Sequence, residues 1–134
     1  MQPNKAFKDI VLKLINELEK DKKALVFNEG RDIKRLLYED IVFIQSIDHC
    51  ICIKTTDCLY KTCTFKMSDI QSELNDSRFV QVHKSYIINI SYIREISKNS
   101  VAMMEYSHEI PVSVTRREEL IRRIMLFEER KHLY

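Results

Sequence analysis

Apolar and polar residues alternate in short runs from Ala24 onward. Alternation over about four to eight residues, bounded by turn-forming residues, is typical of half-buried β-strands. Gly30 is the only glycine in the sequence, and it marks the turn between the first two runs. The pattern predicts strands over residues 24–28, 33–37, 41–46, 50–55 and 59–64.

A short helix and a second group of β-prone runs follow. Ser68 with Gln71 three residues later is a capping-box pattern, which predicts a helix that ends near Leu74. The next stretch, FVQVHKSYIINI at residues 79–90, places a histidine, a lysine and a serine on a short turn between two apolar runs. Further strands are predicted over residues 93–96, 101–105 and 109–113, the last two paired as a hairpin.

Helical periodicity marks the two ends of the chain. Residues 5–21 are predicted to form an amphipathic helix, whose apolar stripe must pack on another surface: Phe7, Ile10, Val11, Leu14 and Leu18. Near the other end, Thr115 with Glu118 is a second capping-box pattern, followed by an apolar stripe from Leu120 to Phe127. Glu118 and Glu119 are expected to lie near the start of this helix, where they would complement its dipole. The sequence therefore predicts a mainly β fold of short antiparallel sheets, with a small internal helix and a helix at each end.

Composition adds limits rather than a function. The 134 residues include 22 basic and 20 acidic side chains, so the net charge of +2 does not by itself indicate a nucleic-acid binder. A single glycine cannot supply a glycine-rich phosphate-binding loop, which excludes the common nucleotide-binding motifs. No apolar run approaches the roughly 20 residues of a membrane span, and the N-terminus lacks the pattern of a signal peptide. We expect a cytoplasmic protein with no membrane partner.

The stretch at residues 79–90 resembles the signature of the LytTR family of DNA-binding domains. The residues that carry the likeness are Phe79, His83, Lys84, Ser85, Tyr86, Ile87, Ile88 and Asn89. The flanks agree: residues 38–44 resemble the entry strand of the family, residues 65–74 its connecting helix, and EIPVSVTRR at residues 109–117 its closing segment. The resemblance covers about residues 24–127 and implies three sheets. It suggests that residues 24–134 form a LytTR-like DNA-binding domain with a C-terminal helix, and that residues 1–23 form an amphipathic helix or linker.

The resemblance implies that loops, and not a recognition helix, enter the grooves of double-stranded DNA. Carried over residue by residue, the candidates in the signature are His83 and Lys84. Thr115, Arg116 and Arg117 follow the serine of the closing segment, and the turn around His49 is the third candidate. Thr115 stands where the family usually has a basic residue, so Arg116 is expected to supply the charge. A lysine or arginine can bind guanine acceptors or phosphate.

The four cysteines offer another chemistry. Cys50, Cys52, Cys58 and Cys63 lack the paired spacing of structural zinc sites, so no metal is expected. A disulfide is not expected either, because the cytosol is reducing. A redox-sensing thiol stays open. We expect no other cofactor and no small-molecule substrate.

Catalysis is not expected. His83 and Ser85, two apart on a strand, are the one tempting pair, but no acid in the adjacent sequence orients the histidine. The other role for the pair is structural, with Ser85 bonded to the turn backbone and His83 at a strand end.

The favoured function is a sequence-specific, bacterial-type transcription regulator, which the resemblance implies would bind direct repeats, with a homodimer on DNA as one form. Family members commonly carry a phosphoacceptor receiver domain ahead of this part, as response regulators of two-component systems do. We expect either a stand-alone regulator or a leading helix that is part of a linker. Two alternatives remain: a protein-interaction module that docks through the N-terminal helix, or a thiol or zinc sensor.

Overall fold

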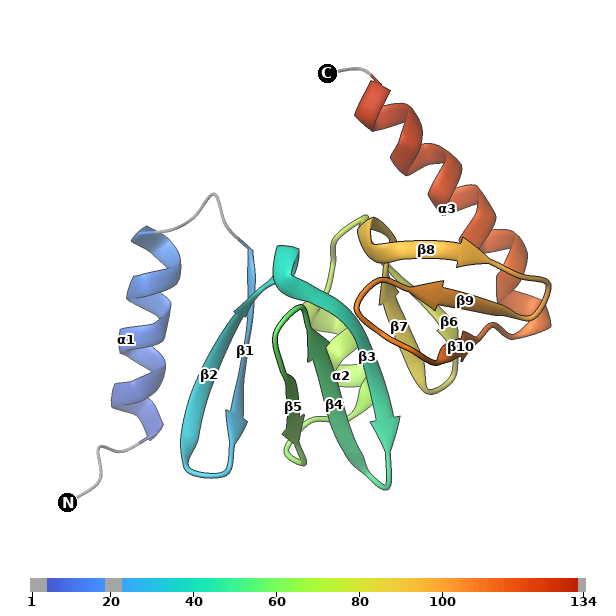
Figure 1. Cartoon of the computed structure of the whole chain (residues 1–134). Coiled ribbons are helices and arrows are strands. Elements are labelled where there is room, and N and C mark those ends of the chain that lie inside the picture. The colour runs from blue at the N-terminus through green and yellow to red at the C-terminus, as the bar shows by residue number, and fades with distance from the viewer. Residues whose placement is uncertain (1–4, 19–22, 133–134) are drawn as a thin grey trace.

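Short antiparallel strands and three α-helices make up most of the described part of the chain, as the sequence predicts (Figure 1). A computed structural model describes residues 5–18 and 23–132, and within these residues the strands form three antiparallel sheets. The elements are α1 (Lys5–Leu18), β1 (Ala24–Glu29), β2 (Asp32–Leu37), η1 (Tyr38–Asp40), β3 (Ile41–Ile47), β4 (Cys50–Thr55), β5 (Leu59–Thr62), α2 (Met67–Glu73), β6 (Phe79–His83), β7 (Tyr86–Asn89), η2 (Ile90–Tyr92), β8 (Ile93–Ile96), β9 (Ser100–Met103), β10 (Glu109–Pro111) and α3 (Val114–His132). The mainly β fold is thereby confirmed.

The largest sheet has the strand order β5-β4-β3-β7-β6. Its central strand, β3, pairs antiparallel with both β4 and β7. Successive side chains of a strand point to opposite faces, and both faces of β3 are covered. Ile44 is fully buried on one face, whereas Phe43 is buried on the other. This explains why β3 reads as a continuous apolar run over its first four residues.

One face of the central sheet is covered by α2 and by the hairpin of β1 and β2. Leu25 and Phe27 of β1 and Ile70 of α2 are buried in the first core with the isoleucines of β3 and β4. The hairpin turn contains Gly30, which has a φ of +61°. Glycine adopts this left-handed conformation without strain because it has no Cβ. The β1 hairpin also protects an edge strand, because the carboxylate of Glu29 accepts the backbone N–H of Lys61 in β5 at 2.9 Å.

The opposite face is covered by the sheet β10-β9-β8 and by α3, in warm colours in Figure 1. Val101, Met103, Ile110 and Leu120 are fully buried in this second core. The predicted hairpin of the last two strands is confirmed by the pairing of β9 with β10. Helix α3 also covers the outer edge of β6, where the guanidinium of Arg123 donates to backbone carbonyls at 3.0 and 3.1 Å.

Asn89 joins the two halves of the central sheet. Its side chain is fully buried, and its amide donates to the carbonyls of Ile41 at 2.9 Å and Tyr38 at 3.3 Å. Its side-chain oxygen accepts the N–H of Ser91 at 2.9 Å, which caps η2. A buried amide without such partners would cost free energy, so this polar residue fixes the register between η1 and the end of β7.

Helix α1 differs from the prediction in its packing. Its side chains at Phe7, Ile10 and Leu14 are between 55% and 59% exposed, so the apolar stripe is covered only in part by the rest of the described chain. The helix also touches the β1–β2 turn, where Lys8 donates to the carbonyl of Arg31 at 3.3 Å. The predicted residues 19–21 lie outside the described part of the chain.

Neither predicted cap residue lies at the start of its helix. Helix α2 begins at Met67, because the carboxylate of Asp69 accepts the backbone N–H of Lys66 at 2.9 Å, and Ser68 lies inside the helix. Helix α3 begins at Val114, one residue before Thr115, so it has no acidic residue in its first turn. The expectation that Glu118 and Glu119 complement the start of its dipole was therefore wrong. The residues between β10 and α3 fix this start, because the N–H of Ser113 donates to the carbonyl of Val82 in β6.

Candidate nucleic-acid interface

Three segments that are far apart in the sequence meet at one end of the central sheet. The N–H of Ser46, at the end of β3, donates to the carbonyl of Ser85 in the β6–β7 turn at 2.9 Å. The N–H of Ser113, just before α3, donates to the carbonyl of Val82 in β6 at 2.8 Å. We call the resulting surface the rim. It comprises Asp48 and His49, His83 to Ser85, and Val114 to Arg117.

The β6–β7 turn is held by the histidine itself. Nδ1 of His83 accepts the backbone N–H of Ser85 at 3.1 Å, and its ring packs edge-on against Tyr86 with centroids 5.8 Å apart. Because Nδ1 is an acceptor, the proton of the neutral imidazole belongs on Nε2, where it can be donated to another molecule. Lys84 is exposed at the tip. The turn thus offers two donors from a fixed backbone.

Tyr86 anchors this turn to the sheet. Its hydroxyl accepts a hydrogen bond from the amide of Gln45 in β3 at 2.7 Å. Burial, and then the neighbouring Tyr106, raise the pKa of Tyr86 above its ordinary value, so the phenol stays neutral. Tyr86 thus supports the turn, although its ring is only half-buried.

The pairing of His83 with Ser85 is structural in form. The imidazole bonds the backbone N–H of Ser85, and no hydrogen bond links it to the serine hydroxyl. Of the two roles weighed for the pair, the imidazole takes the one at the strand end.

The β3–β4 turn has a different backbone. Asp48 and His49 have φ angles of 48° and 64°, and they alone separate the paired residues Ile47 and Cys50. Two successive left-handed residues form the type I′ turn that suits the twist of a hairpin. The left-handed region is unfavourable for residues other than glycine, though aspartate and histidine are more tolerated there than most. The geometry of this turn therefore fixes the direction in which the exposed side chain of His49 leaves the backbone.

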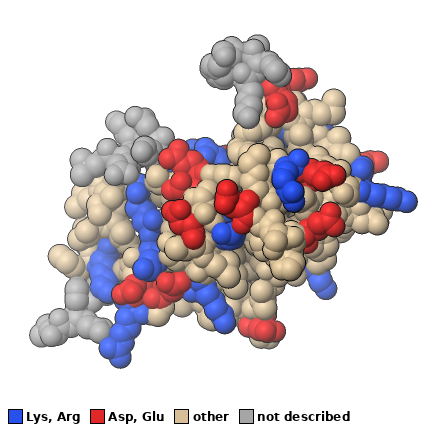
Figure 2. Space-filling view, viewed as in Figure 1, with Lys and Arg blue, Asp and Glu red and all other residues tan. Residues whose placement is uncertain are grey.

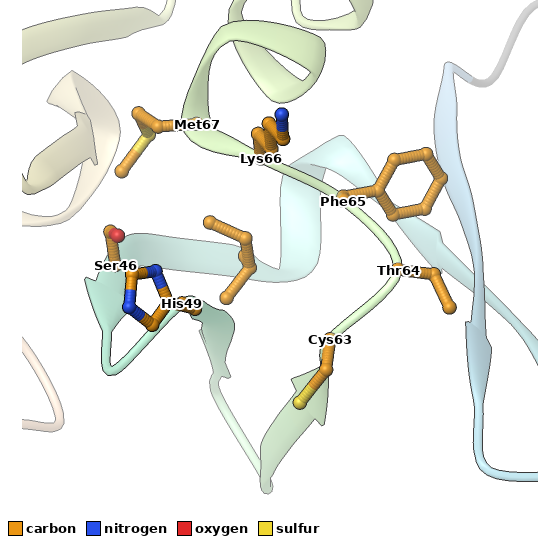
Figure 3. A pocket seen from close by; sticks show the side chains of 8 residues that line it. Ser46, His49, Cys63, Thr64, Phe65, Lys66 and Met67 are labelled. Atoms are coloured by element: carbon orange, nitrogen blue, oxygen red, sulfur yellow. The ribbon is translucent and has the colours of Figure 1, made fainter.

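A hollow of about 330 Å³ lies behind this turn. Figure 3 shows His49, Ser46 and Met67 on one side of it and Cys63 and Thr64 on the other. Sequence reasoning missed Ser46 and Thr64 as neighbours of His49, since they belong to other strands and loops. Only the pairing of β3, β4 and β5 brings them together.

Helix α3 presents its first turn to the rim. Thr115 is exposed, whereas Arg116 and Arg117 are half-buried. The guanidinium of Arg117 donates to the carbonyl of Lys98 at 2.9 Å, which ties it to the β8–β9 turn. The N-terminus of a helix carries partial positive charge and free N–H groups, so this turn suits an anion.

Val114 was missed by the sequence analysis. It is the first residue of α3, and 85% of its side chain is exposed. An exposed valine beside threonine and arginine can contact the methyl group of thymine. Its place directly after the serine of the closing segment was the signal available in the sequence.

The charged side chains are more mixed than a simple basic face. In Figure 2, Lys and Arg are interspersed with Asp and Glu over the visible surface, as expected at a net charge of +2. The cations of the rim are local: Lys84 from the β6–β7 turn, and Arg116 and Arg117 from the start of α3.

The expectation about the cysteines was wrong for two of them. Cys50 and Cys63 form a disulfide across the ends of β4 and β5, whereas Cys52 is free and buried and Cys58 is free and exposed. Ile51 of β4 pairs with Thr62 of β5, so Cys50, just before Ile51, lies opposite Cys63, just after Thr62. The spacing of the cysteines in the sequence could not reveal this. Across the described residues, no three His, Cys, Asp or Glu side chains gather as metal ligands.

Comparison with known proteins gives the family. The sequence model of the family described as "LytTr DNA-binding domain" matches residues 31–125, which span the central sheet, the rim and most of both cores. The chain belongs to the LytTR family. Searched over its described residues, this LytTR protein has no helix long and apolar enough to cross a membrane.

Curated relatives and a solved structure agree with the family. The LytTR protein is 34% identical over 100 residues to sensory transduction protein LytT of Bacillus subtilis (strain 168), a match that covers 72% of this chain and 41% of that protein. LytT of Bacillus anthracis is 34% identical over 86 residues, 61% of this chain and 35% of LytT. The matches thus cover less than half the length of either relative.

The fold is shared with a LytTr DNA-binding domain of a putative methyl-accepting/DNA response regulator from Bacillus cereus. The TM-score is 0.65 at 13% sequence identity, and the match covers 77% of this chain and 97% of that one.

Proposed function

We propose that the chain is a sequence-specific DNA-binding regulator of transcription that works in the bacterial cytoplasm and contacts double-stranded DNA through the rim. The observation that carries this proposal is the pair of backbone hydrogen bonds, Ser46 to Ser85 and Ser113 to Val82, which fasten the three candidate segments to one another. Side chains that read DNA must keep a fixed spacing, and backbone bonds between strands provide it.

Each segment has its own task in this proposal. His83 and Lys84 enter the major groove, where Nε2–H and the ammonium donate to guanine acceptors or phosphate. Val114 and Thr115 contact bases, and Arg116 contacts phosphate. Arg117 holds α3 to the β8–β9 turn through the carbonyl of Lys98 and adds its charge to the same surface. His49 contacts a base edge or a phosphate from the β3–β4 turn.

Two copies are proposed to bind successive direct repeats, each through its own rim. The relatives named sensory transduction proteins support a place at the output end of a signal-transduction pathway, in a two-component system. The division into residues 1–23 and 24–134 is part of the same proposal. No catalytic activity is proposed, and neither the interaction-module alternative nor the thiol- or zinc-sensor alternative gains support from the family match.

Selection of bound sequences from randomised duplex DNA tests the proposal. The full chain should enrich a motif that occurs twice in the same orientation. A Lys84→Ala, Arg116→Ala variant with an unchanged melting temperature should enrich nothing. If the unaltered chain enriches no motif, specific DNA binding is refuted.

Salt dependence tests the electrostatic part separately. If each site neutralises about five phosphates, the logarithm of the association constant should fall with the logarithm of salt concentration with a slope of roughly −4 to −5. Fluorescence anisotropy with the selected duplex measures it. A flat salt response would contradict phosphate contact by the rim cations.

A further inference from the structure

A disulfide closes the β4–β5 hairpin directly behind the rim. Cys50 is the first residue of β4 and follows His49, and Cys63 directly follows the last residue of β5. Their Cα atoms are 4.2 Å apart, so the paired strands already hold the two side chains together. Formation or loss of the bond therefore needs no refolding of the hairpin.

A disulfide is unusual in the cytoplasm, where the proposed function places this protein. A protein that binds bacterial DNA works in a reducing cytoplasm, where lasting structural disulfides are rare and those that form are mostly transient or redox-sensing. We propose that Cys50 and Cys63 are a reversible thiol–disulfide modification site for a small anionic disulfide such as oxidised glutathione, and that the oxidised pair strengthens DNA binding. This inference rests on the proposed function.

The hollow behind the rim gives a small disulfide access to the pair. Cys63 is exposed and lines the hollow with His49, Thr64 and Lys66, as Figure 3 shows. Lys66 adds a positive charge to the lining of the hollow, which attracts the carboxylates of glutathione. Cys50 is less accessible, which favours Cys63 as the thiol that reacts first.

The exchange balances without another reactant. The Cys63 thiolate attacks one sulfur of oxidised glutathione, forms a mixed disulfide and releases one glutathione thiolate. The Cys50 thiolate then attacks the sulfur of Cys63 and releases the second. Two electrons pass from the protein dithiol to glutathione, and the two thiol protons end on the two glutathione molecules.

The disulfide affects DNA binding because it fastens the edge of the central sheet next to the β3–β4 turn. Strand β5 has only four residues and lies at the sheet edge, and residues 63–66 beyond it have no helix or strand. The disulfide fastens this end to Cys50, next to the left-handed His49. Without it, the β3–β4 turn keeps its left-handed backbone but loses a neighbour that limits its motion, so His49 is held less firmly.

The other two cysteines provide matched controls. Cys58 is free and exposed, but it lies at the opposite end of the same hairpin, beside Thr55. Cys52 is buried and opposes Lys61 across the β4–β5 ladder. Neither has a second thiol opposite it, so neither can replace a member of the pair.

A redox titration without DNA tests the modification site. The full chain is equilibrated in glutathione buffers of increasing oxidised fraction, its free thiols are alkylated, and the mass is measured. Half-conversion of the Cys50–Cys63 pair should fall within the buffer range, and a Cys58→Ser variant should behave identically. A pair that stays fully oxidised or fully reduced throughout overturns the inference, whether or not the chain binds DNA.

DNA affinity in the two states tests the regulatory consequence. The oxidised chain should bind the selected duplex roughly fivefold more tightly than the reduced chain, the lower end of what one base contact contributes. Cys63→Ser and Cys50→Ser variants, each checked by its melting curve, should bind with the reduced affinity in both buffers, whereas Cys58→Ser should keep the difference. Equal affinity of the oxidised and reduced chain overturns this consequence. Failure of both states to bind any DNA overturns the proposed function, and the regulation falls with it.

Discussion

Two hairpin turns lie side by side at the rim and are built in opposite ways. In the β3–β4 turn, Asp48 and His49 are both left-handed. In the β6–β7 turn, neither Lys84 nor Ser85 has a positive φ, and the ladder is irregular just before it, between Gln81 and His83. The first turn keeps a regular register and an unfavourable backbone, whereas the second keeps a relaxed backbone and a bulged register.

The difference shows two ways to hold a polar side chain still. The β6–β7 turn is fixed by its own side chains, since His83 accepts the N–H of Ser85 and packs on Tyr86. The β3–β4 turn is fixed by its neighbours, namely the pairing of Ile47 with Cys50 and the disulfide to Cys63. The two turns should therefore respond differently to substitution.

The largest loss of stability is expected from Asn89, which links β3 and β7, the strands that adjoin the two turns. An Asn89→Ala variant leaves the N–H of Ser91 and the carbonyls of Ile41 and Tyr38 without their buried partner, and should lower the free energy of unfolding by about 3 kcal/mol. Denaturant titration measures this, with Asn75→Ala at an exposed position as control. An equal loss in both variants would contradict the role of Asn89.

Removal of the ammonium at the tip of the β6–β7 turn should act on binding alone. Lys84→Ala is expected to weaken DNA binding about tenfold, the effect of losing one good base or phosphate contact. The free energy of unfolding should stay within about 0.5 kcal/mol, because Lys84 is exposed. Lys54→Ala, at the far end of the central sheet, is the matched control and should bind normally. Equal weakening in both variants would point to net charge and not to the rim.

Substitution of His83 should separate its two roles. His83→Ala loses the acceptor for the Ser85 N–H, and should cost about 1 kcal/mol of stability as well as DNA affinity. His83→Asn can restore the acceptor, because asparagine bonds the backbone two residues on, but it does not restore the Nε2 donor. Melting curves should thus recover in the asparagine variant while binding does not. Recovery of both would assign His83 to the turn alone.

The smallest effect is on the free energy of unfolding, which should change in opposite directions when glycine is placed in each of the two turns. His49→Gly creates an Asp-Gly pair, which suits the left-handed turn, and should raise the free energy of unfolding by about 0.5 kcal/mol. Lys84→Gly should lower it by a similar amount, since that turn has no left-handed residue to relieve. Both should weaken DNA binding. Thermal melting of the two variants in parallel checks the signs, and a shift in the same direction would refute the comparison.

Much of the fold followed from local pattern. The continuous apolar run of β3 reflects a strand whose side chains face two cores, and Ile51 and Ile53 of β4 face the first core. The ranges of both strands could therefore be predicted to within a residue. The capping boxes were less reliable. Ser68 and Thr115 were plausible caps by residue type, but Asp69 and the backbone bond of Ser113 to Val82 decided where the helices begin.

The candidate site was only partly predictable. The resemblance of residues 79–90 to a family signature drew attention to His83 and Lys84, and it could not show that Nδ1 of His83 is occupied. Val114 has no polar group to attract notice, and its exposure depends on the start of α3. The disulfide was missed because the argument from compartment outweighed spacing, and strand register was unknown.

The sequence by itself determined the strands, the presence of three helices and the family, because these depend on the period of apolar residues and on a contiguous motif. Only the tertiary structure decided which residues share a surface. The β3–β4 turn, the β6–β7 turn and the start of α3 are each separated from the next by more than 25 residues in sequence. Their meeting therefore depends on strand order and on two backbone hydrogen bonds. The same strand register placed Cys50 opposite Cys63, which no local pattern encodes.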